Sequence, residues 1–214
     1  MSNAPGLLPT WPALSLAQAH ARLTAPGSPF EMDEREIRGQ RIRVWKNAPP
    51  TLREVFLAGR AFGPRAFLVY DDERASYEGF SRAALALAGH LAAHGVRKGD
   101  RVAIAMRNLP EWPVAFFAII LLGAVATPLN AWWTGPELEY GLRDCGASVA
   151  IVDSERFERL SEHLHACPDL TLLLASRHDD EMAHPLAARL EDVIGAPNDW
   201  MALPEGRLPD VALD

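Results

Sequence analysis

Three side chains that bind soft metals occur within five residues of this sequence: His163, His165 and Cys167. Imidazoles and a thiolate are ligands that Zn²⁺ accepts. In a helix, however, residues two positions apart point about 200° away from each other. The three groups cannot converge on one ion unless the helix unwinds, so their spacing indicates no metal site.

A second pair of histidines, His90 and His94, has the four-residue spacing with which metalloprotease helices bind zinc. Those helices need a glutamate as general base directly after the first histidine, and this chain has Leu91 there. We therefore interpret the pair as part of a solvated helix edge.

Two glycines flank a lysine in the segment Gly95-Val-Arg-Lys-Gly99. A phosphate-binding loop wraps its backbone N–H groups around a nucleotide, but it needs the spacing Gly-x-x-x-x-Gly-Lys-Ser/Thr. This segment lacks that spacing, and we expect a left-handed helix cap at Gly95 followed by a turn.

Asn108 follows an apolar run of strand length, and parallel sheets bind ligands where their strands end. Asn108 and Glu111 also have the spacing of a variant capping box, and we favour this helix-capping interpretation. Trp132 and Trp133, beside Thr134, could line a ligand pocket. Because adjacent side chains face different ways, we expect one indole in the core and the other toward a partner.

These residues lie on an unbroken β-α-β-α-β pattern between Gly99 and Asp153. Apolar runs of strand length occur at residues 101–106, 124–129 and 148–152. Residues 111–122 have helical length and are apolar on every side, so we expect a buried helix that Gly123 ends. A second helix opens at Thr134. The pattern predicts an α/β fold with a mainly parallel sheet and helices on both of its faces.

Short stretches of this unit carry a resemblance to a known family. They are Gly99-Asp-Arg-Val-Ala-Ile104, Asn108 with Glu111, Gly123-Ala-Val-Ala-Thr-Pro-Leu-Asn130, Glu137-Leu138, Asp144-Cys-Gly-Ala147 and, upstream, Tyr77-Glu-Gly-Phe80. Together, in this order, they resemble the amino-terminal part of the adenylate-forming (AMP-binding) superfamily, with the acyl-CoA synthetases the most similar members. The resemblance covers roughly residues 51–153.

The resemblance implies an ATP-dependent acid-thiol ligase that converts a carboxylic acid, ATP and CoA to acyl-CoA, AMP and pyrophosphate. ATP, Mg²⁺ and coenzyme A would be cofactors of the parent enzyme. The family's phosphate loop ending in Pro-Lys-Gly, its later acidic and aromatic motifs and its carboxy-terminal lysine have no matching positions here. We therefore expect no catalytic, cofactor-binding or metal-binding residue in this chain, no cofactor held by it alone, and no activity by itself.

The flanks predict further elements. At the amino-terminal side, a capping box of Ser15 and Gln18 opens a helix, and residues 30–45 alternate as a β-hairpin around Gly39. A second capping box at Thr51 opens another helix, and a long helix ending at Gly95 follows two short strands. After the central unit, we expect a helix capped by Ser154, a strand at 171–174, a helix at 186–194 and a proline-rich loop from Pro197 onward.

Composition excludes several classes of protein. The 214 residues include 21 basic and 28 acidic side chains, and the net charge of −7 argues against a nucleic-acid partner. Two cysteines make no disulfide framework and favour a reducing cytoplasm. The first residues lack the pattern of a signal peptide, and the uncharged stretch 113–129 is interrupted by Gly123 and Pro128, so no membrane span is expected.

We therefore predict three segments: an accessory helix and hairpin at 1–50, an α/β subdomain at 51–195, and a linker at 196–214 toward a missing phosphate-loop subdomain. The predicted function is the scaffold part of an acyl-CoA synthetase of fatty acid metabolism, with the remainder of that enzyme as its partner. Self-association through an apolar face of the 112–122 helix and the two tryptophans is also expected. The alternative is a free-standing, non-catalytic α/β binding or assembly module.

Overall fold

The chain divides into two units, residues 1–51 and 52–214, and the computed structural model describes residues 13–178 and 184–211. The described part of the first unit has three elements: α1 (Leu16–Leu23), β1 (Met32–Ile37) and β2 (Gln40–Trp45). Ser15 and Gln18 form the expected capping box. Arg38 and Gly39 have φ of 53° and 77°, as a two-residue hairpin turn requires. The predicted helix and hairpin are confirmed.

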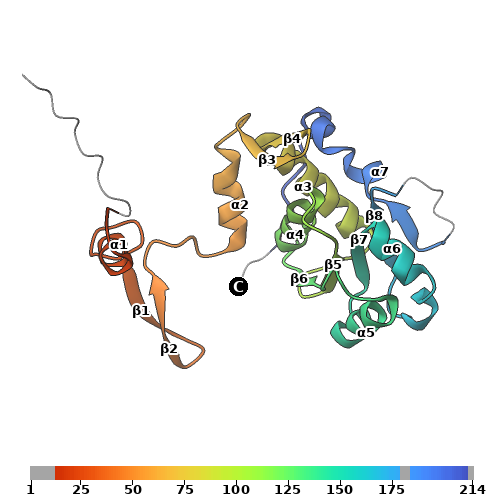
Figure 1. Ribbon diagram of the computed structural model, residues 1–214, viewed down its shortest axis with the longest axis horizontal. Coiled ribbons are helices and arrows are strands. Elements are labelled where there is room, and N and C mark those ends of the chain that lie inside the picture. Colours follow the sequence, from red (N-terminus) through yellow and green to blue (C-terminus); the bar gives the residue numbers. More distant parts are fainter. Residues whose placement is uncertain (1–12, 179–183, 212–214) are drawn as a thin grey trace, which may run out of the picture. The chain divides into compact units, whose positions relative to one another are not determined.

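A parallel sheet of five strands forms the centre of the second unit (Figure 1). Its strands are β5 (Arg101–Ala105), β6 (Val125–Pro128), β7 (Val149–Asp153), β8 (Leu172–Ser176) and β9 (Ala187–Arg189), in the spatial order β6-β5-β7-β8-β9. Every neighbouring pair is parallel. The predicted α/β class and the β-α-β-α-β unit are confirmed.

Alternate residues of the strands face two separate apolar clusters, one on each side of the sheet. One side is covered by α3 (Tyr77–Ala93) and α4 (Glu111–Leu121), against which Val102 and Ile104 of β5 pack. The other side is covered by α5 (Gly135–Cys145) and α6 (Ser154–Ser161), against Ala103 and Ala105. This alternation follows from the two-residue period of a strand, and it places helices on both faces.

Helix α2 (Leu52–Arg60) and an antiparallel hairpin of β3 (Ala66–Tyr70) and β4 (Glu73–Ser76) complete the α3 side. Ring contacts join Phe56 of α2 to Phe80 of α3 and Phe117 of α4. Gly95 ends α3 with φ of 89°, and the Val96 N–H donates to the Leu91 carbonyl, which makes the predicted left-handed cap. Gly123 has φ of 67° directly after α4, as predicted.

Several sequence-based predictions after β7 are wrong. The helix expected at 186–194 is instead the edge strand β9 followed by a short helix, α7 (Glu191–Ile194). Backbone bonds to β8 override the helical propensity: the Leu173 N–H donates to the Leu186 carbonyl, and the Leu190 N–H donates to the Ala175 carbonyl. The cap of α6 is Asp153 rather than Ser154, because the Asp153 carboxylate accepts the Arg156 N–H at 3.1 Å.

The loop expected from Pro197 begins instead as a 3-10 helix, Pro197–Ala202, and another short 3-10 helix, Leu164–Ala166, follows α6. Trp200 is fully buried in the apolar cluster on the α3 and α4 side of the sheet, and its burial anchors the 3-10 helix Pro197–Ala202. The following residues 203–211 contain no helix or strand. Arginines hold them: Arg82 donates to the Leu203 carbonyl at 2.7 Å, and Arg53 donates to the Pro209 carbonyl at 2.6 Å.

Candidate functional site

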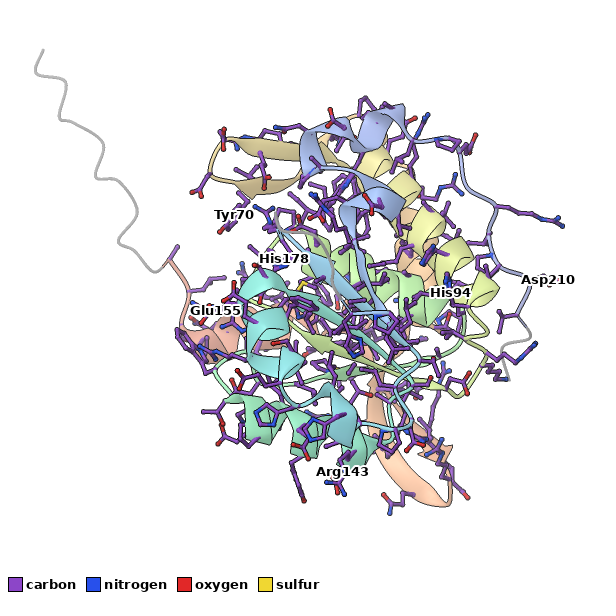
Figure 2. The ribbon with its side chains drawn as sticks, turned by 90° about the vertical axis from the view of Figure 1, so that its right-hand side faces the viewer. Tyr70, His94, Arg143, Glu155, His178 and Asp210 are labelled. Atoms are coloured by element: carbon purple, nitrogen blue, oxygen red, sulfur yellow. The ribbon has the colours of Figure 1, made fainter. Side chains whose placement is uncertain are left out.

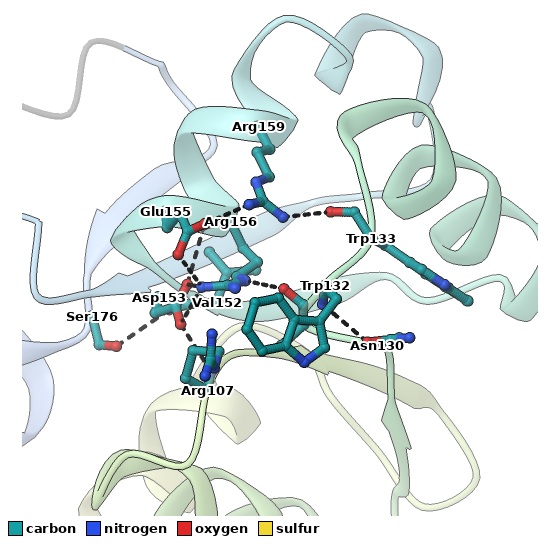
Figure 3. Close-up of polar contacts among 11 residues, drawn as sticks. Arg107, Asn130, Trp132, Trp133, Val152, Asp153, Glu155, Arg156, Arg159 and Ser176 are labelled. Carbon is teal, nitrogen blue, oxygen red and sulfur yellow. Dashed lines mark hydrogen bonds and ion pairs between the residues drawn. The ribbon is translucent and has the colours of Figure 1, made fainter.

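Polar residues follow the carboxyl ends of four neighbouring strands (Figure 3). Arg107 follows β5 and Asn130 follows β6, while Asp153 and Ser176 are the last residues of β7 and β8. Because the strands are parallel, these ends meet at one edge of the sheet, which is where open α/β sheets bind ligands. We call this region the carboxyl edge.

Asp153 is the centre of the hydrogen-bond network at the carboxyl edge. One carboxylate oxygen accepts the backbone N–H of Arg107 at 2.9 Å, and the other accepts that of Arg156 at 3.1 Å. The Arg156 guanidinium also donates to both oxygens at 3.1 Å. The two side chains are 7% and 1% exposed, so this is a buried ion pair that joins the end of β5 to the start of α6.

The same helix holds the loop between β6 and α5, residues 130–134. Arg156 Nε donates to the Ala131 carbonyl at 2.5 Å, and one turn later Arg159 Nη1 donates to the Trp133 carbonyl at 2.8 Å (Figure 3). Inside the loop, the Trp132 N–H donates to the Asn130 side-chain oxygen at 2.9 Å. We call residues 130–134 the Trp132 loop.

The two tryptophans of the Trp132 loop have opposite environments. Trp133 packs against the α5 and α6 cluster, where a Cβ added at Gly141 would lie 2.6 Å from its ring. Trp132 is 69% exposed, and the Arg107 guanidinium lies 3.9 Å from the centre of its ring. The two indoles thus face different ways, as predicted, while a partner for the outward Trp132 stays a prediction. A guanidinium on an exposed indole can stack on planar groups and bind anions.

An open hollow of about 440 Å³ lies at the carboxyl edge. It is lined by Tyr70, Arg107, Asn108, Leu109, Asp153, Ser154, Glu155, Arg156 and Arg177. Tyr70 and Glu155 are labelled in Figure 2, together with the neighbouring His178. His178 Nδ1 is 3.2 Å from the hydroxyl of Ser154, a lining residue. Asn108, the candidate ligand-binding residue from the sequence, is one of the residues that line this hollow.

A second ion cluster fixes the other side of the hollow. Arg177, which follows β8 with φ of 57°, donates to Glu73 at 2.7 Å and to Glu111 at 2.9 Å. Burial raises the pKa of the Glu111 carboxyl, and the nearby Arg177 lowers it by a smaller amount. The predicted capping box of Asn108 and Glu111 is wrong. Pro110 is the N-cap without a side-chain bond, because Glu111 pairs with Arg177 instead.

The other sequence candidates lie apart from the carboxyl edge. His163 is 3.2 Å from Glu139 and Cys167 is buried, while the rings of His90 and His94 are 4.2 Å apart on α3. Burial lowers the pKa of His90. Within residues 13–178 and 184–211, no three His, Cys, Asp or Glu side chains are grouped so that they could hold a metal ion. No helix in those ranges is long and apolar enough to cross a membrane.

Sequence reasoning missed Arg107, Arg156 and Arg177 as parts of the site. A signal was present for Arg156, since Asp153 directly follows a predicted strand and Arg156 lies three residues later, as in a helix-start ion pair. Arg177 left no such signal, because its partners Glu73 and Glu111 are 104 and 66 residues away in the chain.

The sheet and its polar carboxyl edge define an open α/β domain of the type that binds ligands at strand ends. The AMP-binding enzyme family matches residues 56–203, and the chain belongs to that family. It is 34% identical over 110 residues to 2-succinylbenzoate–CoA ligase of Bacillus subtilis, which covers 51% of this chain and 23% of the relative. A long-chain-fatty-acid–CoA ligase of Escherichia coli is 45% identical over 60 residues, covering 28% and 11%.

Solved structures show the same fold. MbtA of Mycobacterium smegmatis superposes with a TM-score of 0.63 and 25% identity over 78% of this chain and 30% of its own. The chain spans about a quarter or less of the length of the two curated ligases named above. Gly95 and Gly99 form a helix cap and a turn in the part of the chain that the structure describes.

Proposed function

We propose that this chain is the amino-terminal scaffold of an ATP-dependent acyl-CoA synthetase, which converts a carboxylic acid, ATP and CoA to acyl-CoA, AMP and pyrophosphate. The observation that carries the proposal is the family match over residues 56–203. The relatives act on acids as different as succinylbenzoate and long-chain fatty acids, so we assign no acyl substrate. ATP, Mg²⁺ and CoA belong to the proposed parent enzyme.

The scaffold role rests on what the described residues lack. Adenylation needs donors around a triphosphate, an acidic group for magnesium and a cation at the α-phosphate. The sequence has no phosphate loop, and the described residues have no acidic cluster. The reacting groups would therefore come from the remainder of the parent enzyme, with the carboxyl edge as one wall of the shared ligand site.

Apolar side chains that are exposed or half-buried on α2 and α4 support the proposal that other parts of the enzyme complete the site. On α2, Leu52 and Val55 are 46% and 42% exposed. On α4, Trp112 and Phe116 stack with ring centres 5.5 Å apart and remain half-buried. Arg53 of α2 donates to the Leu121 carbonyl of α4, so the two helices lie side by side. We call Leu52, Val55, Trp112 and Phe116 the α2–α4 face, and we propose that the remainder of the enzyme covers it.

Carboxylate-dependent exchange of pyrophosphate into ATP tests the proposal. The purified chain, free of host synthetases, should show no exchange, because positioning and charge stabilisation supply most of this chemistry. A longer protein, expressed from the genomic frame continued past Asp214, should show exchange that depends on an added carboxylic acid.

Each outcome decides between the two candidate functions. Exchange by the 214-residue chain alone would overturn the scaffold role. A stop codon directly after Asp214 in the genomic frame, together with no exchange by the purified chain, would favour the free-standing binding module.

A further inference from the structure

A fully buried arginine at the start of α6 is unusual because burying a charge costs free energy even when it is paired. Arg156 is 1% exposed, and its Nη2 atom has no hydrogen-bond partner within the described residues. Replacing such a pair by apolar residues is often neutral or stabilising, so stability alone does not account for it. Its geometry suggests another role.

The guanidinium of Arg156 links the start of α6 directly to the Trp132 loop and, through Asp153, to the end of β5. Its Nη1 donates to Asp153, whose carboxylate also accepts the Arg107 N–H at 2.9 Å. Its Nε donates to the Ala131 carbonyl, the residue directly before Trp132. The Asp153–Arg156 pair therefore fixes both members of the stacked pair: Asp153 holds the backbone that carries Arg107, and Arg156 holds both Asp153 and the backbone next to Trp132.

We propose that Arg156 is a positioning residue, which holds the Trp132 loop and the end of β5 so that the Trp132 indole lies under the Arg107 guanidinium before any ligand or second subdomain is bound. A platform fixed in advance loses less entropy on binding. The proposal rests on the proposed function only in assigning the carboxyl edge to the shared ligand site. The planar fork of arginine is required, since its Nε and Nη1 atoms reach Ala131 and Asp153 from two fixed positions, whereas lysine carries all its donors on one nitrogen.

The test is fluorine NMR of the full chain labelled with 5-fluorotryptophan. The chain has six tryptophans, and the Trp132 signal is the one lost in Trp132→Phe. Arg107→Met removes the stacking directly and gives the chemical shift of an unstacked Trp132. Arg143→Met is the matched control, because Arg143 is 60% exposed and pairs with Glu139 at the surface of α5.

In Arg156→Met and in Arg156→Lys, the Trp132 signal should move toward its position in Arg107→Met. The signal of buried Trp200 should stay in place, which shows that the core is intact, and Arg143→Met should move neither signal. An unmoved Trp132 signal in Arg156→Met, or full restoration by lysine, would overturn the proposal.

If Arg156→Met does not fold, Arg159→Met decides. This variant removes the bond to the Trp133 carbonyl together with the surface ion pair to Glu155, from a side chain that is 32% exposed. A smaller shift of Trp132 in the same direction supports positioning by α6, and no shift contradicts it. The measurement needs no ligase activity, so its failure and the failure of the proposed function are distinguishable.

Discussion

Arg177 is the residue on which the hairpin side of the carboxyl edge depends. It follows β8, and it binds Glu73 of β4 and Glu111 of α4 at once. Its own N–H donates to Glu191 at 2.7 Å, and its guanidinium lies 5.2 Å from the centre of the Tyr70 ring. Arg177 thus joins the end of β8 to β3, β4, α4 and α7. Ion pairs between residues distant in sequence therefore fix the wall of the hollow that Tyr70 forms.

Glu111 should make stability depend on pH. Burial raises its pKa, so the folded chain holds a proton more tightly than the unfolded chain. The free energy of unfolding should therefore fall as the pH rises from the ordinary carboxyl pKa to the raised one, and then level off. Urea unfolding between about pH 4 and pH 7 should show this slope in the parent and a flatter one in Glu111→Gln.

Glu137 provides a control of opposite sign. The Thr134 N–H lowers the pKa of the Glu137 carboxyl, so its contribution is present at higher pH and lost as the pH falls. Glu137→Gln should therefore remove a slope that rises with pH. Equal slopes for the parent and Glu111→Gln would show that Arg177 fully offsets the effect of burial.

Gly123, between α4 and β6, has a left-handed backbone conformation and little space for a side chain. Its φ is 67°, and an added Cβ would lie 3.1 Å from both Lys98 and Val211. Gly123→Val should lower the free energy of unfolding by about 2–3 kcal/mol. Gly89→Ala on α3 is the control, since nothing lies within 4 Å of its added Cβ, and it should be neutral or stabilising. Unchanged urea unfolding of Gly123→Val would contradict this role.

At the scale of elements, local pattern predicted the central unit well and the last segments poorly. The apolar periods of α3 and α4 and the runs of β5 to β8 are carried by consecutive residues. Residues 186–194 contain good helix formers, but pairing of their first half with β8 decided their structure. Trp200 gave no local signal either, because its burial depends on α3 residues more than 100 positions earlier. Contacts of this separation cannot be predicted from periodicity.

The 3-10 helix Pro197–Ala202 should be essential to the core although it is short. Trp200 is fully buried, and its indole N–H donates to the Gly195 carbonyl at 3.3 Å. Trp200→Ala should lower the free energy of unfolding by about 3–5 kcal/mol. Trp132→Ala makes the same chemical change at a site that is 69% exposed, and it should cost less than about 1 kcal/mol. Similar urea midpoints for both variants would refute the assignment of Trp200 to the core.

At the scale of the whole molecule, the α2–α4 face should make the folded 214-residue chain self-associate and bind hydrophobic molecules. We expect binding of the hydrophobic dye ANS and concentration-dependent light scattering. The double variant Leu52→Ser/Val55→Ser should weaken both signals. Tyr140→Ser is the control, because Tyr140 is 67% exposed on α5, across the sheet. A strictly monomeric chain without dye binding would instead favour the free-standing module.

The two edges of the sheet decide how copies of the second unit can associate. Edge strands usually invite pairing with another chain through their free N–H and C=O groups. Here β6 has four residues and ends in Pro128, which has no N–H to donate, and β9 has three residues. Neither edge gives an incoming strand a ladder of useful length. Copies of this unit should therefore not associate by extending the five-stranded sheet into a continuous cross-β ladder.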